Sequence, residues 1–364
     1  MKLFKTILIF TIFQISASNF WASGRLPEEI QEMLDMMSAV DSPRYPGFRN
    51  FYRYSVSRYN CSGKNHAEWY ETGVKRFGWG IYYISSGLLF QVIGWPVLYI
   101  FFTKIKMKAY IVMIFIGVIE ITEVWGNSIW PGFVALLGEV YCTSPQIMTI
   151  VGKVTMVQWI LGSATAVFLG IHRLLSMINF GESLINTNAM ISFWLAFLTI
   201  YAIYGSLFFD TVLFNSDYMA PLLDPMTEQE GVTYSNNFLY FHNISAAVLL
   251  VTVYTSLCLV WRFREVKNFS AQAMKFQKSL LLQSICISLT YAVPAISFVT
   301  LYFFVTPKWF SHASDISYQL SGGIPFIMYI VLNNTVREEI FSCCKKNPAS
   351  SQVKIHSTTV HSFN

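Results

Sequence analysis

The sequence predicts an all-α membrane protein, a bundle of seven transmembrane helices. Hydrophobic residues make up 54% of the chain and charged residues 12%, about half the charged fraction of a soluble domain. The mean hydropathy is +0.45. Seven apolar segments follow a polar N-terminal stretch, and each can supply the ~20 residues that a helix needs to cross a bilayer. We therefore expect one membrane domain embedded in lipid. The net charge of +5 gives no reason to expect a nucleic-acid partner.

Residues 1–18 have the order of a secretory signal peptide. Lys2 and Lys5 precede a short apolar run, and small residues follow it. We expect cleavage, which leaves the mature N-terminus outside the cell; an uncleaved anchor is the alternative. Residues 19–76 are polar and form the predicted extracellular N-terminal segment. They include an N-x-S sequon at Asn60, where we predict glycosylation.

Residues 77–333 are predicted to form the seven-transmembrane bundle. Only helices are expected in the lipid, because a helix satisfies every backbone N–H and C=O group within the segment. The segment from Cys142 to Arg173 suits the middle of the bundle, because its single lysine, Lys153, must face protein or water rather than lipid. The predicted helices are 77–103, 109–134, 144–174, 188–209, 239–262, 279–304 and 314–333. Four prolines within or near them are expected to kink the helices: Pro96, Pro131, Pro294 and Pro325.

Basic residues in the loops predict the orientation of the bundle. Thirteen Lys and Arg residues fall in the short loops and tail of one side, whereas Lys308 alone falls in the short loops of the other. The 210–238 loop of that second side carries five acidic residues and no basic one. The positive-inside rule then places the N-terminus outside and the C-terminus inside. Residues 334–364 are predicted to be a juxtamembrane helix and a cytoplasmic tail.

Four of the six cysteines sort by the compartment they face. Cys258 and Cys286 lie within predicted helices, where a buried thiol is usually a small apolar side chain. Cys61 and Cys142 alone face the oxidising side of the membrane, so a disulfide between them is the favoured interpretation and two free thiols the alternative.

The remaining two cysteines, Cys343 and Cys344, follow a juxtamembrane segment after the seventh helix. If this segment is helical, Val336, Ile340 and Phe341 are expected to face lipid. The two thiols would then lie at the bilayer surface, either palmitoylated or unmodified.

Three charged residues lie at membrane depth in the predicted helices. Glu120 and Glu123 are three residues apart and share a helical face. At ~1.5 Å per residue, Glu123 lies about 22 Å above Lys108 and Lys153 about 30 Å above Arg173, so a tilt brings Glu123 and Lys153 towards one layer. Two interpretations remain: a structural ion pair, or a polar floor for a ligand cavity open to the outside, where an acidic ligand would compete for Lys153.

No enzyme signature is present in the sequence. It contains no HExxH, CxxC, P-loop or GxGxxG motif. Ser163 stands beside a glycine, a pattern more typical of helix packing than of a nucleophile. His172 and His242 fall near opposite ends of the membrane, too far apart to share a metal ion. We expect no enzymatic activity, no cofactor and no metal site.

Six stretches in order resemble one receptor family. They are YNCSGKNHAEWYETGV (59–74), IVMIFIGVIEI (111–121), GEVYCTSP (138–145), FFDTVLFNSDYMAPLLDP (208–225), YFHNIS (240–245) and SGGIPFIMYIVLNNTVRE (321–338). Over about residues 59–340 the chain resembles the nematode serpentine chemoreceptors of class T, the Srt type, which are seven-helix G-protein-coupled receptors.

The resemblance implies an extracellular small-molecule ligand, a heterotrimeric G protein as partner, and the plasma membrane of chemosensory neurons, with their cilia, as the location. Glu120 stands where the family usually has an acid, which implies a place in the polar core. Arg173 matches the arginine that ends the third helix, which implies G-protein coupling, although His172 replaces the preceding Asn that is frequent in the family. Pro325 and Tyr329 stand in for a proline–tyrosine switch, with one extra residue between them.

Two other functions remain as alternatives. A transporter or channel is the first, but transporters are often built from repeats, and the two halves of this chain show none. The second is a protein with a receptor fold that has no ligand and assists the trafficking or scaffolding of other proteins.

Overall fold

The computed structural model describes residues 59–104, 109–178, 187–225, 234–264 and 271–342. The chain divides into two units, Met1–Asn60 and Cys61–Asn364. Only Tyr59 and Asn60 of the first unit are among the described residues, so the fold below is that of the second unit. The predicted signal peptide, Cys343 and Cys344 lie outside the described residues.

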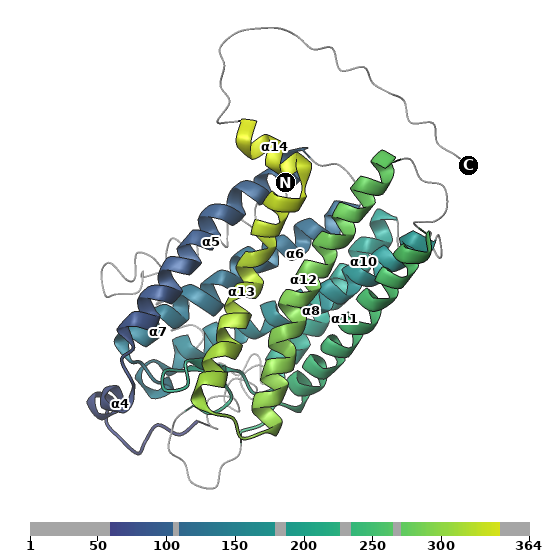
Figure 1. Cartoon of the computed structure of the whole chain (residues 1–364). Coiled ribbons are helices and arrows are strands. Elements are labelled where there is room, and N and C mark those ends of the chain that lie inside the picture. The colour runs from purple at the N-terminus through teal and green to yellow at the C-terminus, as the bar shows by residue number, and fades with distance from the viewer. Residues whose placement is uncertain (1–58, 105–108, 179–186, 226–233, 265–270, 343–364) are drawn as a thin grey trace, which may run out of the picture. The chain divides into compact units, whose positions relative to one another are not determined.

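Long helices make up most of this second unit (Figure 1). Six spans of the described chain are long and apolar enough to cross a membrane. They correspond to α5 (Phe77–Lys104), the run from α6 (Ala109–Val124) to α7 (Trp130–Leu137), α8 (Pro145–Ile178), α10 (Asn188–Leu207), α11 (Asn237–Arg264) and α12 (Ala271–Phe303). The seventh predicted span is α13 (Lys308–Leu332), which is 25 residues long and begins six residues before the expected 314.

The more polar composition of α13 has a structural reason. Its first half carries Ser314, Asp315 and Gln319, and all three are buried within the bundle. α13 packs against α12, α5 and α6, so these polar groups face protein rather than lipid. A hydropathy criterion therefore misses this helix, although its 25 residues are enough to cross a bilayer.

The second span contains a wide turn just before its proline. α6 ends at Val124, a π-helical turn, η1, covers Trp125–Ile129, and α7 begins at Trp130. Pro131 has no N–H with which to bond the carbonyl group of Asn127, so the ordinary α pattern cannot continue through this point. Pro96, Pro294 and Pro325 each lie inside a helix that continues past them.

α8 is the central helix of the bundle. It packs against α6, α10, α11 and α12, and more than half of its 34 residues are buried. Its residues Ile160 and Leu169 are fully buried in the core of the bundle. Large apolar side chains such as Val92, Phe197 and Val248 are exposed on the outer faces of other helices. A bundle that is apolar on both its inner and outer faces is typical of a membrane domain.

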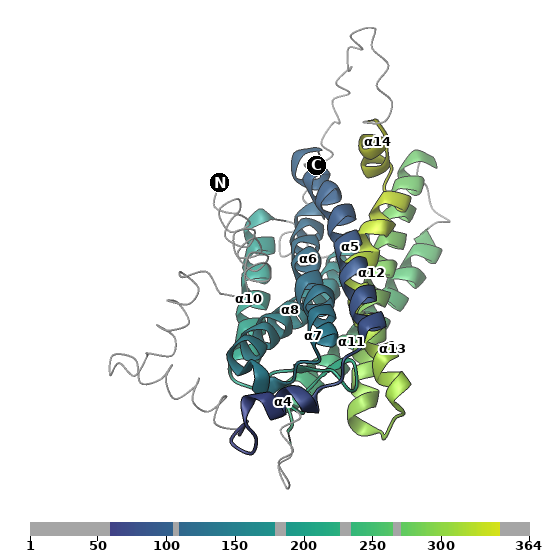
Figure 2. The same cartoon turned by 90° about the vertical axis from the view of Figure 1, so that its left-hand side faces the viewer.

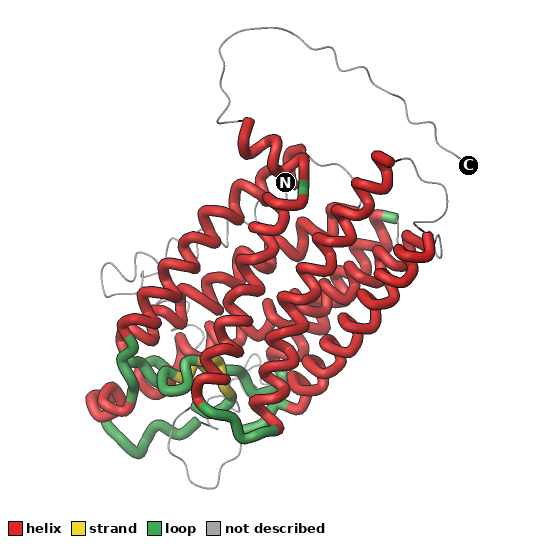
Figure 3. Tube along the Cα trace, viewed as in Figure 1, coloured by secondary structure: helices red, strands yellow, loops and turns green. Residues whose placement is uncertain are grey.

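The two ends of the bundle differ (Figures 1 and 2). The short helix α4 (His66–Thr72) lies at one end, and α14 (Asn334–Ser342) lies at the opposite end. Loops gather at the α4 end, together with the one strand pair of the described chain (Figure 3). There, β1 (Leu213–Asn215) runs antiparallel to β2 (Ala220–Leu222), with Phe214 opposite Pro221.

α14 turns back onto the bundle rather than out into lipid. Asn333 ends α13, and its Oδ1 atom accepts hydrogen bonds from the N–H groups of Thr335 and Val336. Val336 is fully buried in the core, and Ile340 packs against it. The expectation that these two residues face lipid is therefore wrong, because the Asn333 cap redirects the chain. Phe341 is exposed, which agrees with the expectation.

Candidate functional site

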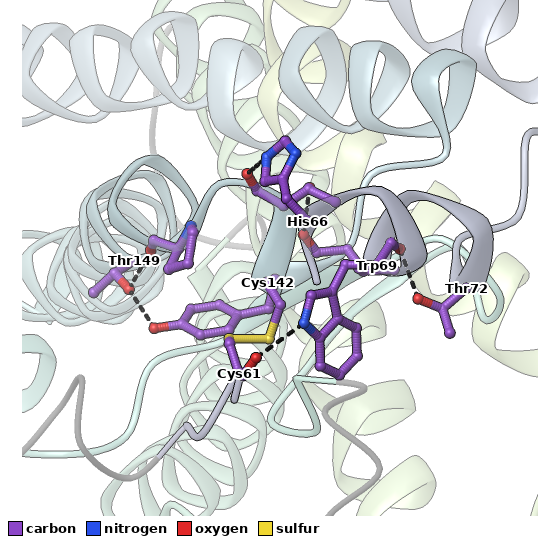
Figure 4. The surroundings of a disulfide bond; sticks show 10 residues. Cys61, His66, Trp69, Thr72, Cys142 and Thr149 are labelled. Atoms are coloured by element: carbon purple, nitrogen blue, oxygen red, sulfur yellow. Dashed lines mark hydrogen bonds between the residues drawn. A yellow bond between two sulfur atoms is a disulfide. The ribbon is translucent and has the colours of Figure 1, made fainter. Parts of the chain in front are cut away.

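A disulfide fixes the polypeptide across one end of the bundle (Figure 4). Cys61 is bonded to Cys142 in the short 3-10 helix η2 (Tyr141–Thr143), with their Cα atoms 5.5 Å apart. Trp69 Nε1 donates a hydrogen bond of 3.1 Å to the carbonyl oxygen of Cys61, and His66 Nε2 donates one of 3.2 Å to that of Thr143. The predicted disulfide is confirmed. It joins α4 to the chain that enters the central helix.

Glu139 lies between α7 and η2 at this end and is buried. Burial raises the pKa of the Glu139 carboxyl group above its usual range, and the charge of His66 offsets part of that rise. The chain turns at Gly138 just before it, with φ +67, a conformation that favours glycine. Gly73 approaches so closely that a Cβ atom there would lie 1.7 Å from the Gly138 carbonyl oxygen. The segment formed by α4 and the Cys61–Cys142 disulfide, called the cap below, therefore fits closely onto the end of α7.

The β1–β2 hairpin is held to the bundle through one acid at its turn. Asp217 accepts a 2.6 Å contact from Lys308 Nζ at the start of α13 and a longer one, 3.5 Å, from Arg76. The Val74 N–H group donates to Ser216 Oγ at 3.3 Å. The hairpin is thus fixed to the α4 side and to the α13 side at once.

A small cavity of about 20 Å³ lies under this hairpin. Its size is close to that of a single water molecule and well below that of an organic ligand. Hairpin residues form one wall, and η1, α7, α8 and α13 form the rest. Its lining includes Asn127, Trp130, Thr155, Val212, Phe214, Pro221, Asp315 and Tyr318.

Several polar atoms in this lining have no hydrogen-bond partner among the described residues. They are Oδ1 of Asn127, Oγ1 of Thr155, Oδ1 of Asp315 and the hydroxyl oxygen of Tyr318, and all four residues are at least nine-tenths buried. Asn127 Nδ2 donates to the carbonyl group of Tyr318 at 3.2 Å, so its amide oxygen is the atom left over. A buried polar atom without a partner is destabilising by about 1–3 kcal/mol, so these atoms mark the cavity as a candidate ligand site.

Lys153 does not meet Glu123. Its Nζ atom donates two hydrogen bonds of 2.6 Å, to the carbonyl oxygens of Ser206 and Phe209 at the C-terminal end of α10. Asp210 adds an opposite charge nearby. The predicted Glu123 pairing is therefore wrong: estimates of helix rise compare depths, but they do not show that the end of α10 folds over α8. Cations suit this position because the last carbonyl groups of a helix are free.

Glu120 and Glu123 are both fully buried on α6. Within the described part of the chain, no oxygen of either carboxylate has a hydrogen bond. The hydroxyl group of Tyr318 approaches Glu123 closely enough to interact electrostatically, and those of Tyr291 and Tyr329 approach Glu120 in the same way. The predicted polar site at Glu120 is thus a cluster of carboxylates surrounded by tyrosines.

Arg173 lies near the other end of α8, where its guanidinium group turns inwards. Nη2 donates to Met113 Sδ at 3.2 Å, and the Nε atom is buried although the residue as a whole is partly exposed. Tyr110, Tyr254 and Tyr329 surround the charge. Tyr329 also interacts electrostatically with Glu120.

The two predicted switch residues lie inside α13. Pro325 is buried one turn before Tyr329. The fully buried ring of Tyr329 packs edge-on against Phe101 of α5, with ring centres 4.9 Å apart. Asn60, the predicted glycosylation site, is exposed.

Sequence reasoning missed a hydrogen-bonded row that crosses three helices. Ser163 of α8 donates to the Trp159 carbonyl group at 2.7 Å and lies 2.8 Å from His242 Nε2 on α11. Tyr201 of α10 lies 3.1 Å from Nδ1 of the same ring. Because the serine proton is already donated to a carbonyl group, Nε2 carries the proton and Ser163 accepts it. The arrangement joins helices and leaves the serine without a base.

Asp315 is the main cavity residue that sequence reasoning overlooked. It stands inside the predicted seventh helix, and an acid at membrane depth is by itself a signal of function. Asn127 and Thr155 gave no comparable signal, because uncharged polar residues are common in membrane helices. Among the described residues, no group of three His, Cys, Asp or Glu side chains is arranged to hold a metal ion.

Comparisons with known proteins agree with this architecture. The sequence model of a family described as "Serpentine type 7TM GPCR chemoreceptor Srt" matches residues 45–353. Over an alignment of 376 residues, the chain is 57% identical to "Serpentine receptor class T-55" of Caenorhabditis elegans, with all of both chains covered. The family match spans every transmembrane helix described above. The chain therefore belongs to the Srt family of serpentine seven-transmembrane chemoreceptors.

Proposed function

We propose that the chain is a chemosensory receptor that binds an extracellular small molecule and signals to a heterotrimeric G protein. The observation that carries this proposal is the family match over residues 45–353, which includes the whole bundle. The cavity at one end and Arg173 at the other supply two separate sites, which a receptor needs if binding and signalling occur on opposite sides of a membrane.

The end that carries the disulfide and the hairpin is the extracellular one in this proposal. A disulfide persists in an oxidising compartment, and Cys61–Cys142 closes this end. The thirteen-to-one distribution of basic residues supports the same orientation, with the N-terminus outside and α14 in the cytoplasm. We place the receptor in the plasma membrane of chemosensory neurons, in their cilia.

Two observations support a closed, inactive packing in this proposal. The cavity has room for about one water molecule, and Arg173 is turned inwards among tyrosines instead of outwards to a partner. An activating ligand must bind the open packing more tightly than the closed one, because equal affinity for both shifts nothing. Tyr329 interacts electrostatically with both Glu120 and Arg173, which supports a coupling between the buried acid and this arginine.

The test begins with the orientation. An epitope at the mature N-terminus should label on intact cells, and an epitope at the C-terminus only after permeabilisation; the opposite pattern contradicts the receptor topology. Cells that express the receptor with a promiscuous G protein are then screened with small organic compounds. At least one compound should activate the G protein, whereas ionic currents from purified protein would instead indicate a channel.

A receptor that reaches the cell surface but is activated by no compound would support the alternative of a ligandless scaffold protein. The two experiments are therefore read together, because only a receptor that has reached the surface can be scored as silent. A variant without residues 343–364 would test in parallel whether the tail contributes to trafficking.

A further inference from the structure

We propose that the cavity under the hairpin binds the protonated amine group of a small organic ligand, with Asp315 as the counter-ion and Asn127 Oδ1 and Thr155 Oγ1 as further acceptors. This inference rests on the proposed receptor function. It adds the chemical class of the ligand.

Asp315 is the only acid among the residues that line the described cavity, and half of its carboxylate is in use. Its Oδ2 atom accepts a hydrogen bond from the Tyr83 hydroxyl group of α5. Its Oδ1 atom is buried and has no partner in the described chain, and the whole residue is 1% exposed. A carboxylate buried in this way keeps one oxygen that needs a donor, and the described protein does not supply one.

Three cations at this end of the described bundle are engaged elsewhere. Lys308 and Arg76 contact Asp217 on the hairpin, and Lys153 contacts the last carbonyl groups of α10. None of these three residues is part of the cavity lining. Asp315 therefore has no protein counter-charge in the described structure, and a ligand cation would supply it.

Other cavity groups favour the same ligand. Asn127 Oδ1 accepts but cannot donate, and the amide orientation is fixed because Nδ2 already donates to the Tyr318 carbonyl group. An ammonium group carries three donors and no acceptor, which matches two side-chain oxygens and a hydroxyl group. Trp130, Phe214 and Tyr318 add aromatic walls, and a cation near aromatic faces is stabilised further.

An anionic ligand fits this cavity poorly. The Asp315 carboxylate would repel a carboxylate or phosphate group, and the described cavity lining contains no Lys, Arg or His that could pair with such an anion. Lys153, which the sequence suggested as the partner of an acidic ligand, has its amine bound to two carbonyl groups. The electrostatics of the site therefore oppose the acidic class and favour the cationic one.

The experiment uses the purified full-length receptor and a panel of primary amines that runs from butylamine to 2-phenylethylamine. Each amine is tested beside the alcohol and the carboxylate of the same carbon skeleton. The readouts are the midpoint of thermal unfolding and, in cells, G-protein activation. We expect at least one amine to raise the midpoint and activate the receptor, and its matched alcohol and carboxylate to be at least tenfold weaker.

Variants then assign the effect to Asp315. Asp315→Asn should weaken the active amine at least tenfold, because a hydrogen bond to a charged group contributes about tenfold or more in affinity. Asp315→Glu keeps the charge and should recover part of the loss. Glu71→Gln, which changes an exposed acid on α4, is the matched control and should leave amine binding unchanged.

The outcomes separate this inference from the proposed function. Activation by alcohols or carboxylates without any response to amines overturns the amine site and leaves the receptor function standing. A receptor that reaches the cell surface but is activated by no class of compound overturns both the amine site and the proposed receptor function. If Asp315→Asn does not reach the surface, the selectivity of the wild-type receptor among the three matched classes decides: equal binding of amine and alcohol overturns the proposal.

Discussion

The hydroxyl group of Tyr83 on α5 donates a hydrogen bond to Oδ2 of Asp315 on α13, and both residues are buried. The first and last membrane-spanning helices of the bundle are thereby joined through a buried carboxyl group that also lines the cavity. Gln319, one turn further along α13, donates to Ser86 of α5 and to Ser128 of η1 at 2.6 and 2.7 Å. Together these contacts form a polar seam between α5, η1 and α13.

Removal of the Tyr83 hydroxyl group should weaken this seam. We expect Tyr83→Phe to destabilise the receptor by about 1.5–3 kcal/mol, the usual contribution of a hydrogen bond to a charged group. The thermal midpoint of the purified receptor measures the effect. Tyr82→Phe is the matched control, because Tyr82 is its neighbour and is partly exposed. An equal change in both variants would show that the Tyr83 hydroxyl group does not stabilise Asp315.

The disulfide should stabilise the cap as a single unit. Cys61→Ser and Cys142→Ser remove the same bond, so each should lower surface expression to the same extent and the double variant should be no worse. In the chain-entropy model, a disulfide that closes a loop of this length stabilises the folded state by about 3–5 kcal/mol. Surface labelling and peptide mapping check the result. Additive losses in the double variant would contradict one shared bond.

Lys153 should act as a cap on α10. Lys153→Met removes the donor to the Ser206 and Phe209 carbonyl groups and should destabilise the receptor by about 1–3 kcal/mol. Lys153→Arg keeps a charged donor and should be milder. The measurement is thermal unfolding of the purified protein.

An exchange of charges distinguishes this role from an ion pair. Lys153→Glu combined with Glu123→Lys would recover stability if the two side chains were partners. We predict no recovery, because Glu123 lies beside Tyr318 and Lys153 lies at the end of α10. Recovery of stability in the double variant would contradict the role of Lys153 as a cap on α10.

Glu139 should make the cap less stable as the pH rises. Burial raises its pKa in the folded receptor above that of the unfolded chain, so the folded form binds the proton more tightly. The resulting stabilisation is full below the unfolded pKa of about 4.3 and is lost as the pH rises through the raised folded pKa. Thermal midpoints measured from acidic to neutral pH should therefore fall more steeply in the wild type than in Glu139→Gln. Glu71→Gln, on an exposed acid, should keep the wild-type slope; identical slopes in all three proteins would contradict the assignment.

The sequence predicted the features that follow from composition and compartment. Apolar length gave the helices, and the separation of cysteines by membrane side gave the Cys61–Cys142 bond. Contacts between helices were less predictable. The Lys153 partner depends on where the chain turns after α10, and the direction of Val336 depends on the Asn333 cap. Neither is encoded in the periodicity of a single helix.

The cavity also could not be predicted from single segments of the sequence. Its residues come from η1, α7, α8, the hairpin and α13, so they meet only when the bundle is assembled. Asp315 could have been identified as a fourth intramembrane charge. Its bond to Tyr83, which is 232 residues away in the chain, could not.

Arg173 should be needed for signalling and not for surface expression. Its guanidinium group lies among Tyr110, Tyr254 and Tyr329, and activation must release it if it contacts a G protein. Arg173→Ala should therefore abolish activation at an unchanged surface level. Arg337→Ala on α14 is the basic control, because Arg337 is exposed and donates its hydrogen bonds to Val331 and Asn334 close by in the chain. A loss of signalling only in proportion to surface level would indicate a membrane anchor instead.

Compound-evoked G-protein activation, normalised to surface receptor, tests the central claim most directly, with the wild type and the Arg173→Ala variant measured side by side. We predict that at least one small organic compound activates the wild type and that the same compound fails on Arg173→Ala at equal surface level. A wild-type receptor that is present at the surface and silent to every compound, or a full response from Arg173→Ala, would contradict signalling between the hairpin cavity and the cytoplasmic end of α8.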